Sequence, residues 1–262
     1  MITPDKQLIE RRFGAAASTY DKAATPQIQI ADILMGRLSA IMFEQPHRPV
    51  QRALEIGCGT GIFSQRMVAL LGYEGIEYCF NDLSPAVEEP LARKLVGLPY
   101  TFEAYDAEHQ EWGNGYDLIS SSSCIQWWHE PLSFLHKAHA ALNPQGIVVL
   151  STFLPENLQE IHSIQPQKLN YPSAQELART FEELSFTHYE MQKEVIPITF
   201  HSILELLRHL KETGTNALQK NQQIWTPSKL HRLEAKIREE HNLSPEQPLT
   251  LTYQAIIATA VK

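Results

Sequence analysis

The sequence has little cysteine, no long apolar run and no excess of positive charge. The three cysteines among 262 residues, at positions 58, 79 and 124, are too few and too scattered for a disulfide framework or a zinc site, so reduced thiols in a cytoplasmic protein are expected. No stretch is apolar over the roughly 20 residues of a membrane helix, and residues 1–10 are too polar for a signal peptide. The net charge of −8 argues against nucleic acid as a partner. No metal site is predicted.

The chain has the length and patterning of one α/β domain with additions. Hydrophobic residues make up 43% and charged residues 20%, as in ordinary globular proteins. Strand and helix patterns alternate over residues 52–153, which predicts a parallel, doubly wound sheet. A helix at 173–184, a strand near 188–195 and a strong β segment at 249–262 complete a mostly parallel, seven-stranded sheet of the Rossmann-like class.

Helices are expected before this sheet and inside it. Thr3-Pro4 and Thr25-Pro26 are typical helix starts, so residues 1–51 should form a helical cap. About fifty residues separate the last two strands, which is long for a connection without structure. Helical patterns fill it, and because the sixth strand should be parallel, the insertion leaves and returns on the ligand face. The predicted organisation is a single domain with a core sheet (52–200 and 248–262) and a helical lid (201–247).

The stretch ALEIGCGTGIF at residues 53–63 indicates a buried strand, a glycine turn and the start of a helix. Alternating glycines let the backbone turn sharply and let a ligand approach the main chain. A dinucleotide fingerprint would need a third glycine at position 62, which is Ile62. The spacing G-x-G-x-G with Glu55 before it resembles motif I of the Rossmann-like S-adenosylmethionine-dependent methyltransferases. That resemblance implies cofactor contacts from Glu55, Gly57, Cys58, Gly59 and Gly61.

Acidic residues follow the next two strands. Asp82 ends the second strand, where a carboxylate can accept hydrogen bonds from the two hydroxyl groups of a ribose. The alternative is that Asp82 only caps the following helix, although Ser84 can serve that purpose. In the methyltransferases that the motif resembles, Asp106 would take the adenine amino group and Ala107 a backbone contact, with Leu83 beside the ribose.

Aromatic residues are expected to face the cofactor and the reacting methyl group. The fourth strand runs into the segment Ser122 to Trp128, and Ser121, Gln126 and Trp127 are candidate walls of the reaction pocket. Phe13 and Tyr20 are the natural ligand-facing aromatics of the helical cap. The alternative for both is packing against the sheet.

Four segments together resemble one family, the malonyl-[acyl-carrier protein] O-methyltransferases of biotin synthesis. They are FGAAASTYDKAATPQ (13–27), IQWW (125–128), LLRHLKETGTNAL (206–218) and LTYQ (251–254). The resemblance covers nearly the whole chain, including the expected lid. The sequence departs from the family pattern at Glu55, where Asp is more usual, and at the four serines 120–123. The resemblance implies a monomeric enzyme that methylates the carboxylate of a malonyl group on acyl carrier protein or coenzyme A.

Such a reaction needs orientation and no general base, because the attacking carboxylate is already ionised at neutral pH. A cation is expected to recognise the malonyl carboxylate or the phosphate linkage of the carrier. Arg208 and Lys211 are three residues apart on one helix, hence on one face, and one of them, in the first place Arg208, is assigned this role. Tyr20, Gln126 and Trp127 complete the predicted catalytic residues. The alternative for Lys211 is a solvated basic face.

Two other functions remain open for the whole chain. One is methylation of another small carboxylic acid or metabolite, and the other is a non-catalytic adenosylmethionine-binding protein.

Overall fold

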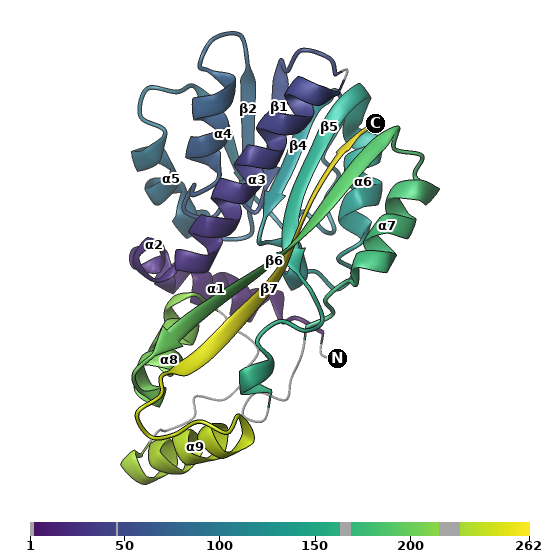
Figure 1. The fold of residues 1–262 in the computed structure, drawn as a ribbon. Coiled ribbons are helices and arrows are strands. Elements are labelled where there is room, and N and C mark those ends of the chain that lie inside the picture. Colours follow the sequence, from purple (N-terminus) through teal and green to yellow (C-terminus); the bar gives the residue numbers. More distant parts are fainter. Residues whose placement is uncertain (1–2, 46, 163–168, 215–225) are drawn as a thin grey trace.

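The computed structural model describes residues 3–45, 47–162, 169–214 and 226–262. A seven-stranded sheet in the order β3-β2-β1-β4-β5-β7-β6 forms its centre (Figure 1). The strands are β1 (Arg52–Ile56), β2 (Glu77–Asp82), β3 (Tyr100–Ala104), β4 (Tyr116–Ser122), β5 (Leu142–Phe153), β6 (His188–Phe200) and β7 (Leu249–Val261).

The strand directions confirm the predicted sheet. Strands β1 to β5 pair in parallel, and β7 lies antiparallel between β5 and β6. Because β6 is antiparallel to β7, it runs in the same direction as the first five strands, as expected. The chain order reverses between β1 and β4, which is the point where an open α/β sheet offers a crevice at the carboxyl ends of its strands.

Helices cover both faces of the sheet (Figure 1). Apolar residues of α3, α4 and α5 pack in one core with β1 and β2, and those of α6 and α7 pack in a second core on the opposite face. The helices are α1 (Lys6–Ala16), α2 (Tyr20–Ala23), α3 (Thr25–Glu44), α4 (Ser64–Leu71), α5 (Glu88–Lys94), α6 (Ser133–Ala141), α7 (Ala174–Glu183), α8 (Ile203–Glu212) and α9 (Pro227–Glu240). No helix of the described ranges is long and apolar enough to cross a membrane.

The two predicted N-terminal helix starts have different outcomes. Thr25-Pro26 does begin α3. The start at Thr3-Pro4 is wrong, because α1 begins at Lys6 and Asp5 caps it, its carboxylate accepting a hydrogen bond from the N–H of Leu8 at 3.1 Å. A carboxylate at that position satisfies an otherwise unpaired amide of the first turn.

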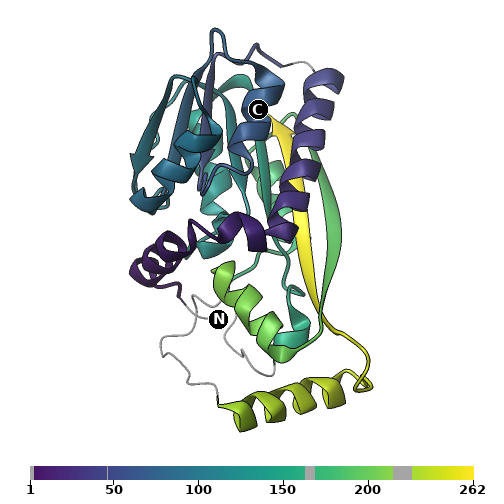
Figure 2. The same ribbon diagram turned by 90° about the vertical axis from the view of Figure 1, so that its left-hand side faces the viewer.

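A third apolar core lies beyond the end of the parallel sheet. The first residues of β7 and the last residues of β6 continue as a two-stranded ribbon past Phe153, the last residue of β5. This ribbon packs with α8, with Ile237 of α9 and with Ile30 of α3. Figures 1 and 2 place α8 below α1 and α2, with α9 at the lower end. Of the insertion expected at 201–247, residues 215–225 lie outside the described residues.

Candidate functional site

A cavity lies at the carboxyl ends of β1, β2 and β4, where the strand order reverses. The glycine turn after β1, the end of β2 and the segment after β3 form its floor. Phe13 and Tyr20 from the N-terminal helices and Trp127 from the segment after β4 close it on the other side. The cavity therefore lies where a doubly wound sheet places a ligand.

The glycine turn needs glycine for two separate reasons. Gly57, Gly59 and Gly61 all have positive φ, at 71°, 52° and 84°. A Cβ on Gly57 would collide with the sulfur of Cys124, and one on Gly61 would lie 2.8 Å from Cδ1 of Leu91. Gly57 thus lets the segment after β4 cross the turn, and Gly61 lets α5 pack beneath it. Gly61 does not line the cavity, whereas Gly57, Cys58 and Gly59 do.

Asp82 joins the end of β2 to the glycine turn. Its Oδ2 accepts a hydrogen bond from the N–H of Gly59 and its Oδ1 accepts one from the N–H of Ser84, both at 2.9 Å. The next turn is capped by the hydroxyl of Ser84, so Asp82 is not its cap. Burial raises the pKa of Asp82, and the three backbone N–H groups that face it act in the opposite direction. A carboxylate has about four lone-pair sites, so it keeps capacity for a ligand hydroxyl beside these three donors.

Glu55 carries a buried oxygen without a partner. The residue is 1% exposed and lines the cavity, and Oε2 makes no hydrogen bond within the described part of the chain. Burial raises the pKa of Glu55 to about 8, the nearby hydroxyl of Ser64 opposes the shift, and the charge of Asp82 adds to it. A buried carboxyl group that faces a cavity unsatisfied is suited to a ligand that brings a donor or a positive charge.

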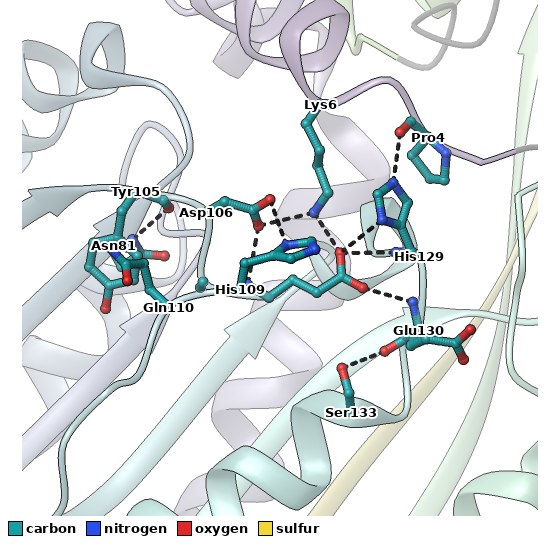
Figure 3. A network of polar contacts seen from close by, with 12 residues as sticks. Pro4, Lys6, Asn81, Tyr105, Asp106, His109, Gln110, His129, Glu130 and Ser133 are labelled. Carbon is teal, nitrogen blue, oxygen red and sulfur yellow. Dashed lines mark hydrogen bonds and ion pairs between the residues drawn. The ribbon is translucent and has the colours of Figure 1, made fainter.

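Asp106 is held by an ion pair that the sequence did not indicate. Nζ of Lys6, from α1, lies 3.2 Å from Oδ1 of Asp106 and 2.9 Å from Oε2 of Glu108 (Figure 3). Burial acts to raise the pKa of Asp106, but the Lys6 ammonium and the N–H of Glu108 outweigh it and lower that pKa. Lys6, Asp106 and Ala107 all line the cavity.

Glu108 is fixed from the sheet side as well. Its two carboxylate oxygens accept hydrogen bonds from the N–H groups of His129 at 3.0 Å and Glu130 at 2.8 Å. Nε2 of His129 donates to the carbonyl of Pro4 at 3.0 Å (Figure 3). Asp106, Glu108 and His109 have ligand atoms within 4.8 Å of one another, but both carboxylates already pair with the Lys6 ammonium.

A second ion pair, also not predicted, joins α2 to the glycine turn. Nζ of Lys94 lies 2.5 Å from Oδ2 of Asp21 and donates to the carbonyl of Thr60 at 2.7 Å. The hydroxyl of Thr60 donates to the other oxygen of Asp21 at 2.5 Å. Residues from α2, α5 and the turn therefore meet next to the cavity.

The aromatic residues pack on one another at the cavity wall. The ring of Phe13 lies edge-on to Trp127 with centroids 5.3 Å apart, and its centroid is 6.2 Å from that of Tyr20. A Cβ on Gly214, just after α8, would come within 2.7 Å of the Phe13 ring, so the inserted segment contacts α1 there. Burial raises the pKa of Tyr20, which keeps its hydroxyl protonated and able to donate.

Several predicted site residues lie outside the cavity wall. Ser121 is fully buried beneath it, and Ser122 and Ser123 line the cavity in its place. Gln126 is 4% exposed, and its Nε2 donates to the carbonyl of Ser123 at 2.6 Å. Leu83, by contrast, does line the cavity.

The two cations of the expected lid are exposed. Arg208 and Lys211 share the outer face of α8, while Ile203, Leu206 and Leu210 face the third core. Neither cation lines the cavity. Their spacing of three residues predicted that they share one face of the helix. Because the apolar face of α8 packs in the third core, this face is turned to solvent.

Comparison with known families identifies the domain. Residues 27–190 match the family model described as "Methyltransferase domain". The malonyl-[acyl-carrier protein] O-methyltransferase of Porphyromonas gingivalis is 32% identical over 95% of this chain and 93% of its own length. The protein of the same name from Haemophilus ducreyi is 33% identical over 98% and 97%.

Solved structures share the fold. The YcgJ protein of Bacillus subtilis has a TM-score of 0.58 at 16% identity, covering 86% of this chain and 97% of its own. The plantazolicin methyltransferase BpumL in complex with SAH has a TM-score of 0.53 at 14% identity, covering 98% and 94%.

Proposed function

The chain belongs to the malonyl-[acyl-carrier protein] O-methyltransferases, and from this we propose that it transfers the methyl group of S-adenosylmethionine to the free carboxylate of a malonyl group carried as a thioester on acyl carrier protein. The product is a methyl ester for biotin synthesis and S-adenosylhomocysteine. The family match extends over both the sheet and the insertion, so it includes the part of the chain expected to choose the substrate. We further propose that the enzyme acts as a monomer in the cytoplasm.

The unpaired Oε2 of Glu55 is the observation that carries the cofactor assignment. A buried carboxyl group of raised pKa facing the cavity is satisfied by the amino group of the methionine part of S-adenosylmethionine. An uncharged ligand without donors would leave it unsatisfied. Gly57, Cys58 and Gly59 line the cavity beside it, and the only side chain on these three residues is the buried thiol of Cys58. The methionine part of the ligand can therefore approach the main chain closely.

The nucleoside part is assigned to the next two strand ends. Asp82 would accept a hydrogen bond from the ribose hydroxyl groups, with Leu83 beside it, because its carboxylate keeps capacity beyond its backbone donors. Asp106 would accept from the adenine amino group and Ala107 would contribute its N–H. Phe13 and Tyr20 would cover the ligand from the cap.

The bound cofactor supplies an electrophilic methyl group, and the protein supplies position. The malonyl carboxylate is ionised at neutral pH, so no side chain has to remove a proton from it. Tyr20, kept protonated by burial, can donate a hydrogen bond that orients this carboxylate. Trp127 and Phe13 exclude water from the same place, and holding the reacting groups aligned in a dry site can lower a barrier by several kcal/mol. Gln126 donates a hydrogen bond to the carbonyl of Ser123 in the cavity wall, so it would act by positioning that wall without contacting the substrate.

Arg208 and Lys211 suit the carrier better than the malonyl carboxylate. They are exposed on α8, outside the cavity wall, and α8 joins the cap where Gly214 contacts Phe13. We propose that these two cations of α8 bind the acidic carrier or its phosphate linkage.

The test uses purified protein with S-adenosylmethionine carrying a labelled methyl group. Malonyl-carrier should become labelled, and the label should leave as methanol on mild alkaline hydrolysis, as expected for a methyl ester. Acetyl-carrier, which has the same thioester and no free carboxylate, should remain unlabelled. Equal labelling of both would defeat the carboxylate assignment. Malonyl-coenzyme A in a third reaction distinguishes a requirement for the carrier from a requirement for the malonyl group.

A further inference from the structure

Two ion-pair clusters hold the first helices of the chain onto the sheet. The helical segment from Thr3 to Ala24 is here called the N-terminal cap. The Lys6 clasp consists of Lys6, Asp106 and Glu108, and the Asp21 clasp consists of Asp21, Thr60 and Lys94. One clasp lies at the start of α1 and the other in α2, so the cap is fastened near both of its ends.

The Lys6 clasp is more than a surface ion pair. Exposed pairs between flexible side chains contribute little, typically about 0–1 kcal/mol. Here the side chains of Lys6 and Glu108 are only 17% and 7% exposed. Two backbone N–H groups fix Glu108 in place before Lys6 reaches it. The carbonyl of Pro4 accepts a hydrogen bond from His129, which fixes the position of the residues just before α1.

The Asp21 clasp is the more exposed of the two, with side chains of Lys94 and Asp21 that are 18% and 45% exposed, but it is likewise held by more than one contact. Asp21 accepts from Lys94 through one oxygen and from the Thr60 hydroxyl through the other, so its carboxylate is held by two separate elements. Lys94 also donates to the carbonyl of Thr60. Since Thr60 belongs to the glycine turn, the position of α2 is tied to the backbone that the methionine part of the cofactor would contact.

Each clasp ends on a segment of the cavity, and the cap residues between them are the ones that close it. Phe13 and Tyr20 lie between Lys6 and Asp21 in the chain, and both line the cavity. The Lys6 clasp also orients Asp106. Oδ1 of Asp106 is occupied by Lys6 and by the N–H of Glu108 at 3.1 Å, while Oδ2 contacts the exposed His109. Oδ2, with one partner against two, therefore has more capacity for a ligand.

We propose that Lys6 and Lys94 are positioning residues for the methyl-transfer reaction. They hold the N-terminal cap closed over the bound nucleoside, and Lys6 in addition turns Asp106 toward it. The inference rests on the proposed cofactor, and it assigns a role to two lysines whose ammonium groups are paired with carboxylates of the protein itself.

The experiment compares four variants of the full chain with the wild type. Lys6→Met and Lys94→Met keep an unbranched side chain of similar length and remove its charge, Lys6→Arg keeps the charge, and Lys22→Met is the matched control on the same cap. Lys22 is an exposed residue of α2 that takes part in neither clasp. Calorimetric titration with S-adenosylhomocysteine should show about tenfold weaker binding for Lys6→Met, equivalent to about 1.4 kcal/mol. Lys6→Arg should recover most of the affinity, and Lys22→Met should bind as the wild type does.

A second measurement needs no ligand. Trypsin can cut the cap after the exposed Arg11, and this cut should be faster in Lys6→Met and in Lys94→Met than in the wild type or in Lys22→Met. Thermal unfolding in parallel checks that the rest of the domain is folded. If Lys6→Met does not fold, Lys94→Met carries both measurements.

The outcomes separate this inference from the proposed function. Wild-type protein that does not bind S-adenosylhomocysteine would contradict the proposed cofactor. Wild-type binding together with unchanged affinity and unchanged cleavage in the folded Lys6→Met and Lys94→Met variants would overturn the role of the two lysines and leave the cofactor in place. Weak binding in Lys6→Met that Lys6→Arg fails to restore would contradict an ion-pair clasp.

Discussion

Oδ2 of Asp82 accepts a hydrogen bond from the N–H of Gly59 at 2.9 Å, so the carboxylate at the end of β2 fixes the turn that follows β1. The two strands are direct neighbours, with Ile56 opposite Asn81 in the register. The parts of the site that would contact the methionine and the ribose are therefore coupled before any ligand arrives. A substitution at Asp82 should therefore weaken contacts to both the ribose and the methionine part of the cofactor.

Replacement of Asp82 should weaken cofactor binding more than the loss of one contact would. Asp82→Ala removes the ribose acceptor and also frees the N–H of Gly59, so the affinity for S-adenosylhomocysteine should fall by at least about tenfold, because charge-assisted hydrogen bonds contribute about 1.5–3 kcal/mol each. Asp82→Asn keeps one acceptor and should lie between. Calorimetry measures all of these, with Asp32→Asn, an exposed carboxylate of α3, as control. Unchanged binding by Asp82→Ala would remove it from the ribose site.

Cofactor binding should release a proton from Glu55. Its pKa of about 8 means that the ligand-free protein holds this carboxyl group protonated at pH 6.5. The amino group of the ligand is already charged at that pH, since α-amino groups titrate near ~8, and its arrival favours the ionised carboxylate. Calorimetric titrations in two buffers of different ionisation enthalpy should therefore report about one proton released by the wild type and none by Glu55→Gln. Equal proton counts in the two proteins would contradict the assignment.

Glu55 should also make the ligand-free protein less stable in alkali. A carboxyl group whose pKa is higher in the folded than in the unfolded state favours folding at low pH and loses that contribution as pH rises through about 8. Glu55→Gln cannot ionise, so its melting temperature should exceed that of the wild type at pH 9 and approach it at pH 6. Scanning calorimetry at both values makes the comparison. A constant difference between the two proteins at both values would mean that Glu55 does not titrate in this range.

The site residues that could be predicted from the sequence are those that directly follow or end a strand. Glu55, the glycines and Asp82 stand at fixed distances from apolar strand patterns, so their meeting at one sheet edge follows from a parallel topology. The clasps could not be predicted in this way, because Lys6 and Asp106 are 100 positions apart and no periodicity relates them. The outer placement of Arg208 likewise depends on α8 packing against β7, which helical spacing alone does not determine.

Gly214→Ala should disturb the contact between the insertion and the cap. Gly214 has a φ of 69°, and its Cβ would come within 2.7 Å of the Phe13 ring. Gly97→Ala is the matched control, since its φ is 80° but its Cβ would meet nothing within 4 Å. Both variants bear the backbone cost, of order 1 kcal/mol, and only Gly214→Ala must displace Phe13. We expect a lower kcat/KM for malonyl-carrier in Gly214→Ala alone. Equal activity of the two variants would show that the Phe13 contact does not matter for turnover.

Charge reversal at Arg208 should affect the carrier and spare the chemistry. Arg208→Glu places a negative charge on the exposed face of α8, so the KM for malonyl-carrier should rise by about tenfold at low salt and the difference should shrink as salt screens it. Lys193→Glu, the same charge change at an exposed position of β6, is the control. Turnover of malonyl-coenzyme A and affinity for S-adenosylhomocysteine should stay near the wild-type values. If Arg208→Glu instead slows the small thioester as much as the carrier, the partner of this arginine is a group that both thioesters share, the phosphate linkage or the malonyl carboxylate, and not the surface of the carrier.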